Sequence, residues 1–143
     1  MNDINIIKKD ALDEALSKKY RLYLTGRLQK PQNELQFIED DIEVGISRYD
    51  VFTADTPHMH PVATEHAYVL EGSIRVRLLD GSEKEFEVNA GDFFVLRPGI
   101  PYATKNKEGT KVLFIKSPEG NDKTVVEADE KTKEWLGSWN VQL

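Results

Sequence analysis

The chain contains no cysteine, and this excludes several kinds of chemistry at once. It can form no disulfide, offers no thiolate to a metal and has no cysteine nucleophile, so any bound metal must use nitrogen and oxygen ligands. Histidine is also scarce, with three in 143 residues. Two histidines that fall close together in such a chain are therefore informative.

Long apolar runs and an excess of basic residues are also missing. No apolar stretch approaches the roughly 20 residues that a membrane-spanning helix needs. Asp and Glu outnumber Lys and Arg by 25 to 19, and the net charge of -6 argues against a surface for nucleic acid or anionic membrane. The first ten residues are too polar for a secretory signal, and a cytoplasmic protein of one domain is the expectation.

The hydrophobic pattern predicts a β protein with short helices near its ends. Residues 10–20 favour a helix, and from about residue 35 apolar residues recur with a period of two. Asp80-Gly81 is a strong hairpin signal, and 93–96 and 112–115 read as buried strands, with Phe93 and Phe114 in the core. Residues 129–136 suggest a terminal helix. Short strands punctuated by turns indicate an antiparallel sandwich or barrel.

One segment carries the clearest chemical signal. His58 and His60 are two residues apart, so in a strand their side chains face the same side. With Glu65 they would form a set of two histidines and one carboxylate, which suits Fe, Mn, Zn or Ni. Glu65 shares its strand face with Ala67 and Val69, where an unpaired carboxylate is costly, so a metal or a cationic partner is expected beside it.

These residues also resemble a known family. The spacing His-x-His-x4-Glu-x6-Gly from His58 to Gly72 is similar to the first motif of the cupin superfamily, and Gly91 to Tyr102 is similar to the second. The resemblance is to a small single-domain metal-binding cupin. It implies an all-β, antiparallel jelly-roll β-barrel with a divalent transition metal and a small-molecule ligand inside, and a homodimer.

The expected division of the chain follows from this resemblance. The cupin barrel would span residues 35–120. Residues 1–34 would form a helical or irregular N-terminal extension. Residues 121–143 would form a tail that packs on the barrel or on a partner subunit.

Tyr102 departs from the family pattern, in which the second motif ends in a histidine that supplies the fourth metal ligand. The implied metal ligands are therefore His58, His60, Glu65 and Tyr102, with the last in question. A tyrosinate could coordinate a hard metal such as Fe(III). Alternatively Tyr102 stays neutral and hydrogen-bonds a ligand, or the site has lost its metal.

The resemblance leaves the function open between two classes. With iron the site could act as a dioxygenase, and with Zn, Mn or Ni as an isomerase or lyase, with Glu65 or Tyr102 moving protons. The alternative is a non-catalytic module that binds a small, sugar-like ligand. Candidates for holding an anionic substrate are Arg48, Arg75, Arg77, Arg97 and Lys116, although Arg75 and Arg77 are expected to face solvent.

Overall fold

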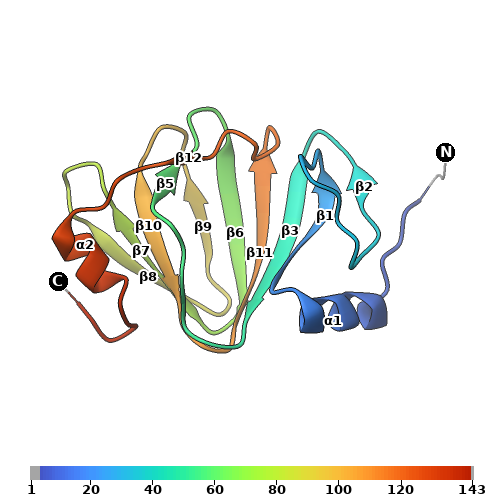
Figure 1. Cartoon of the computed structure of the whole chain (residues 1–143), viewed down its shortest axis with the longest axis horizontal. Helices are drawn as coiled ribbons and strands as arrows, with labels where there is room; N and C mark the ends of the chain where they lie inside the picture. Colours follow the sequence, from blue (N-terminus) through green and yellow to red (C-terminus); the bar gives the residue numbers. More distant parts are fainter. Residues whose placement is uncertain (1–3, 143) are drawn as a thin grey trace.

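Two facing β-sheets make up most of the computed structural model, which describes residues 4–142 (Figure 1). One sheet has the strand order β2 (Ile38–Glu39), β1 (Arg21–Gly26), β3 (Glu43–Tyr49), β11 (Thr110–Ser117), β6 (Thr64–Glu71) and β9 (Phe93–Leu96). The other has the order β12 (Thr124–Val125), β5 (His58–Met59), β10 (Tyr102–Asn106), β7 (Ser73–Leu78) and β8 (Glu85–Asn89), and β4 (Thr53–Ala54) also pairs with β10. Apart from the parallel β1–β2 pair, the pairings are antiparallel, which confirms the predicted class.

The two helices lie at opposite ends of the molecule in Figure 1. Helix α1 spans Lys9–Lys18 and α2 spans Glu130–Trp135, each within two residues of the start and the end predicted from the sequence. Asp129 caps α2 by accepting a hydrogen bond from the backbone N–H of Thr132. The predicted N-terminal and C-terminal helices are thus confirmed.

The hairpin of β7 and β8 forms at the predicted Asp80-Gly81 turn. Gly81 adopts a φ of +92°, in the region that glycine enters at little cost. Ile74 pairs with Val88 across the hairpin, and both point into the space between the sheets. This interior core also contains Ala67 and Val69, the residues that share the strand face of Glu65.

Not every residue that was predicted to lie in the core is buried. Phe114 is buried as expected, but Phe93 is 59% exposed. Phe93 and Phe94 alternate on edge strand β9, and Phe94 takes the inward position opposite Ala67. The prediction for Phe93 was wrong because a run of four apolar residues gives no indication of which face of a strand is buried.

A second core covers part of the outer face of the first sheet. Ala15 and Leu16 of α1 pack against Leu22 of β1 and Ile46 of β3. Strand β1 pairs with β2 and β3 and so belongs to the six-stranded sheet. It lies in the segment that was expected to be a helical or irregular extension.

The C-terminal segment covers the outer face of the second sheet. Arg75 and Arg77 were both expected to face solvent. Arg77 is only 3% exposed, and Cζ of Arg75 lies 4.2 Å from the centroid of the Trp139 ring. Both expectations failed because the pattern of β7 alone carries no sign of a distant segment above it. Lys105 is fully buried beneath the same segment, and its Nζ donates to the backbone carbonyls of Trp135, Ser138 and Val141 at 2.8–2.9 Å.

Between residues 4 and 142, no helix is both long and apolar enough to cross a membrane.

Candidate functional site

His58 lies on β5, where it pairs with Tyr102 of β10 and Val125 of β12. Its Nδ1 is 2.7 Å from the carbonyl oxygen of Thr56. A carbonyl can only accept a hydrogen bond, so Nδ1 carries the ring proton and Nε2 is left with a lone pair. Burial is the main influence on the ring and lowers the pKa of His58, so the imidazole is neutral at pH 7.

His60 is held in the same way by an acidic residue from a distant segment. It is 3% exposed, and its Nδ1 lies 2.8 Å from Oδ1 of Asp122. The other carboxylate oxygen of Asp122 accepts hydrogen bonds from the backbone N–H groups of Val62 and Ala63. Burial opposes the charge of Asp122, but these donors and His60 outweigh it and hold the pKa of Asp122 below its usual range.

Nε2 of His60 has no hydrogen-bond partner among the described residues, although it is buried. In the neutral ring, the proton that Asp122 accepts lies on Nδ1, so this atom carries the lone pair. The rings of His58 and His60 pack edge to face, with 5.2 Å between their centroids. A buried acceptor without a donor is costly, and a cation would satisfy it.

Tyr102 joins His58 to Glu65. Its hydroxyl lies 2.8 Å from Nε2 of His58 and donates to Oε2 of Glu65 at 2.7 Å. Burial, reinforced by the carboxylate of Glu65, raises the pKa of Tyr102, so the phenol stays protonated at neutral pH when no metal is bound. A single hydroxyl proton cannot serve both acceptors, so His58 keeps its lone pair while Glu65 receives the hydrogen bond.

Several of the predicted site residues contact one another, but they do not form a ready metal-binding group. His58, Glu65 and Tyr102 make direct contacts, and His60 packs beside His58. Yet no group of three His, Asp or Glu side chains within residues 4–142 is arranged to hold a metal ion as it stands. The hydroxyl of Tyr102 occupies the position between His58 and Glu65 in this arrangement.

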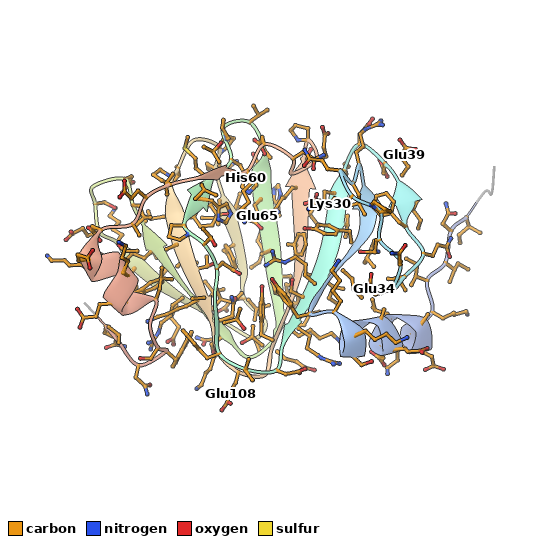
Figure 2. The ribbon with its side chains drawn as sticks, viewed as in Figure 1. Lys30, Glu34, Glu39, His60, Glu65 and Glu108 are labelled. Carbon is orange, nitrogen blue, oxygen red and sulfur yellow. The ribbon has the colours of Figure 1, made fainter. Side chains whose placement is uncertain are left out.

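The donor set itself fits a transition metal. Two imidazole nitrogens with fixed tautomers, one carboxylate and one phenol offer only nitrogen and oxygen atoms, as the absence of cysteine requires. Acceptors on the Nδ1–H groups of both rings are the usual outer contacts of metal-binding histidines. Figure 2 shows His60 and Glu65 toward one end of the sheets and Glu108 at the other end.

A cavity of about 380 Å³ opens beside these residues. His58, Glu65 and Tyr102 line it, and His60 is not part of the lining. The lining combines apolar side chains with polar and charged ones. The apolar members include Ala67, Ile74, Phe94, Leu96, Val112 and Phe114. A volume of this size accommodates a small metabolite.

A network of polar side chains lies along one wall of the cavity. Asp55 accepts hydrogen bonds from Thr104 at 2.9 Å and Asn106 at 3.2 Å, and lies 3.5 Å from Arg21. Arg21 in turn donates to Ser47 and Tyr49. The network fixes the guanidinium of Arg21 against the cavity.

Sequence reasoning missed Asp122, Arg21 and Lys123, all of which matter here. Asp122 lies 62 positions after His60, in a segment where the hydrophobic pattern weakens, and nothing local marks it as a partner of a histidine. Arg21 could have been found, because Leu22 and Leu24 alternate with Arg21 and Tyr23 as in a strand. Of the basic residues that were expected to bind an anion, Lys116 lines the cavity, but it is paired with Glu43 at 3.4 Å.

The fold and the placement of these side chains define a jelly-roll protein with a polar cluster inside the barrel. The chain belongs to the cupin superfamily: the cupin domain family matches residues 46–116, which include both motifs. The sequence is 34% identical over 76 residues to germin-like protein 5-1 of rice, Oryza sativa subsp. japonica, and 33% identical over 78 residues to germin-like protein subfamily T member 3 of Arabidopsis thaliana. Each alignment covers 50% of this chain and 34% of the relative, so the chain spans about a third of the curated relatives it matches.

Solved structures support the same fold. BH2720 from Bacillus halodurans superposes with a TM-score of 0.59 at 17% identity, over 87% of this chain and 90% of that one. KdgF from Halomonas sp. gives a TM-score of 0.50 at 24% identity, over 57% of this chain and 74% of that one. At these identities the likeness establishes the jelly-roll fold and leaves the activity open.

Proposed function

We propose that this chain is a metal-binding cupin in which His58, His60 and Glu65 hold a divalent transition metal beside a small-molecule cavity. The observation that carries the proposal is the pair of fixed imidazoles. Thr56 and Asp122 keep the protons on Nδ1 of His58 and His60, and the buried Nε2 of His60 has no partner among the described residues. Such an arrangement is costly unless a cation completes it.

Tyr102 has two alternative roles in this proposal. Its hydroxyl lies between His58 and Glu65, so it either moves aside when the metal binds or becomes a fourth ligand. In the first case it stays neutral and keeps a proton beside Glu65, where the pair can pass that proton to or from a ligand in the cavity.

The class of reaction depends on the metal. A bound Zn, Mn or Ni ion would supply Lewis acidity for isomerase or lyase chemistry, whereas iron would supply dioxygenase chemistry. The alternative is a binding protein without catalysis. It is supported by the hydrogen bond that the Tyr102 hydroxyl donates to Glu65, which satisfies this carboxylate without a metal.

Metal content and affinity test the proposal. We expect one metal ion per chain, and we expect His60→Ala to abolish its binding. His66→Ala is the matched control, because His66 lies on the opposite face of β6 and stacks on Phe93. A wild-type protein that binds no Fe, Mn, Zn or Ni, or a His60→Ala variant that binds them as tightly as wild type, would refute the metal site.

Spectroscopy distinguishes the two roles of Tyr102. If the phenol coordinates Fe(III), the loaded protein absorbs visible light, and Tyr102→Phe removes that band while one iron per chain remains. If Tyr102 stays neutral, the wild type shows no such band. Oxygen uptake and product analysis on the loaded protein then separate an enzyme from a binding module.

A homodimer is part of the same proposal, and its support is an uncovered apolar sheet face. Helix α1 covers only β1 and β3 of the first sheet. On β6, β9 and β11 the outward residues are His66, Tyr68, Leu70, Phe93, Val95, Leu113 and Ile115. Tyr68, Leu70 and Phe93 are 43%, 39% and 59% exposed, and a contiguous patch of this kind is typical of an interface.

A further inference from the structure

The cavity carries a charge opposite in sign to that of the whole chain. The net charge of the chain is -6. Yet basic groups outnumber acidic groups along the cavity: the basic ones are Lys19, Arg21, Lys30, Lys116 and Lys123, and the acidic ones are Glu43, Asp55 and Glu65. An excess of positive charge inside a concave site of an acidic protein attracts small anions.

Ion pairs cancel only part of this positive charge. Lys116 lies 3.4 Å from Glu43, and Arg21 lies 3.5 Å from Asp55. Lys123 makes no hydrogen bond or ion pair with any residue between 4 and 142, although it lines the same cavity as Arg21, Asp55, Lys116 and Glu65. Burial, followed by the nearby guanidinium of Arg21, lowers the pKa of Lys123. The ammonium of Lys123 thus shares the cavity with carboxylates but has no direct partner among the described residues.

Arg21 offers the cavity a second free donor, in addition to Lys123. Its Nε donates to Ser47, and its Nη2 donates to Tyr49 and lies near Asp55. Nη1 donates to no other residue within 4–142, so its N–H groups remain for a ligand. A free N–H group of a guanidinium can donate a charge-assisted hydrogen bond to a carboxylate oxygen.

Lys123 is also connected to the candidate metal site through the chain itself. The preceding residue, Asp122, orients the ring of His60. Gly120 and Asn121 line the cavity together with Lys123. One short segment thus fixes a histidine with one residue and presents a cation to the cavity with the next.

We propose that the cavity binds a small carboxylic acid, with its carboxylate on Lys123 and Arg21 and its other end beside His58, Glu65 and Tyr102. The position of the reacting end rests on the proposed function, whereas the anion site does not. The lining has only two more positive than negative groups, and Glu43 and Asp55 stay close, so a single negative charge fits better than a doubly charged phosphate.

Calorimetric titration with matched acid and amide pairs tests this proposal. The probes are lactate with lactamide, gluconate with gluconamide, and 4-hydroxybenzoate with 4-hydroxybenzamide. Each amide keeps the shape of its acid and removes the charge. We expect at least one acid to bind on the order of tenfold more tightly than its amide, as charge-assisted hydrogen bonds give.

Two variants test whether Lys123 is responsible for the preference for acids over amides. Lys123→Gln should remove most of it, whereas Lys84→Gln, the same change of charge on the exposed β7–β8 turn, should keep it. Acids that bind no better than amides, no acid that binds at all, an undiminished preference in Lys123→Gln, or tighter binding of inorganic phosphate than of every acid would each overturn the proposal.

The same titrations with metal-free and metal-loaded protein separate this inference from the proposed function. A preference for acids that depends on Lys123 in a protein that binds no metal would support the anion site and refute the metal site. Tight metal binding without such a preference would do the reverse. Direct chelation of the metal by an acid would persist in Lys123→Gln and would therefore count against the anion site.

Discussion

At the scale of single residues, the candidate site depends on which ring nitrogen carries the proton. Thr56 and Asp122 each accept from an Nδ1–H group, and this choice leaves Nε2 of both histidines available. The motif spacing predicts which histidines lie together but cannot specify their tautomers, because Asp122 is remote in sequence. Residues outside the motif thus decide which nitrogen of each histidine is available to a metal.

The first prediction concerns Asp122. Asp122→Asn should weaken metal binding by about 10–100-fold, the usual cost of losing an outer contact of a ligand histidine. The neutral amide no longer requires a proton on Nδ1 of His60, so the proton can occupy Nε2 and block it. Competition with a metal indicator measures the change. Asp80→Asn, on the exposed hairpin turn, is the control and should bind as wild type; equal affinity in both variants would contradict the role of Asp122.

At the scale of elements, close backbone approaches decide which substitutions the fold tolerates. Gly72 lies in the turn between β6 and β7 and has a φ of +78°. A Cβ there would lie 2.3 Å from Oγ1 and 2.6 Å from Cα of Thr110, which is itself fully buried. The last glycine of the first motif therefore serves packing as well as backbone geometry.

Gly72→Ala should lower the free energy of unfolding by about 3 kcal/mol, since it adds an overlap to the penalty for a left-handed residue. Gly81→Ala is the matched control: its φ is +92°, but nothing lies within 4 Å of the added Cβ, so about 1 kcal/mol is expected. Urea unfolding measures both values. Equal losses in the two variants would show that Thr110 yields at little cost.

The attachment of the C-terminal segment is a second feature at this scale. Lys105 satisfies the carbonyls of Trp135, Ser138 and Val141 with its three donors, and its ammonium lies 4.3 Å from the Trp135 ring centroid. Lys105→Met should cost about 2–3 kcal/mol because these carbonyls lose their donor. The exposed Lys84→Met variant is the control. If the segment is held in this way, limited proteolysis should cleave it faster in Lys105→Met alone.

At the scale of the whole molecule, the sequence predicted the interior of the barrel well and its outer surfaces poorly. The alternation of Ile74 and Val76 on β7 correctly placed both in the core. The same alternation placed Arg77 in solvent, where α2 and the segment after it in fact cover the sheet. A period of two distinguishes the faces of a strand, but what packs on the outer face is set by segments far away in the sequence.

The uncovered half of the first sheet leads to the last prediction. Phe93 and Tyr68 are cross-strand neighbours on its outer face, and a lysine at either position would place a charge at the centre of the patch. If two copies associate through this face, Phe93→Lys should shift the mass in light scattering from dimer to monomer and leave the unfolding of the monomer nearly unchanged, because Phe93 is 59% exposed. Phe86→Lys is the control, since Phe86 is 49% exposed but lies on β8 of the other sheet. A wild-type protein that remains monomeric at micromolar concentration, or a dimer that is disrupted only by Phe86→Lys, would exclude this face as the interface.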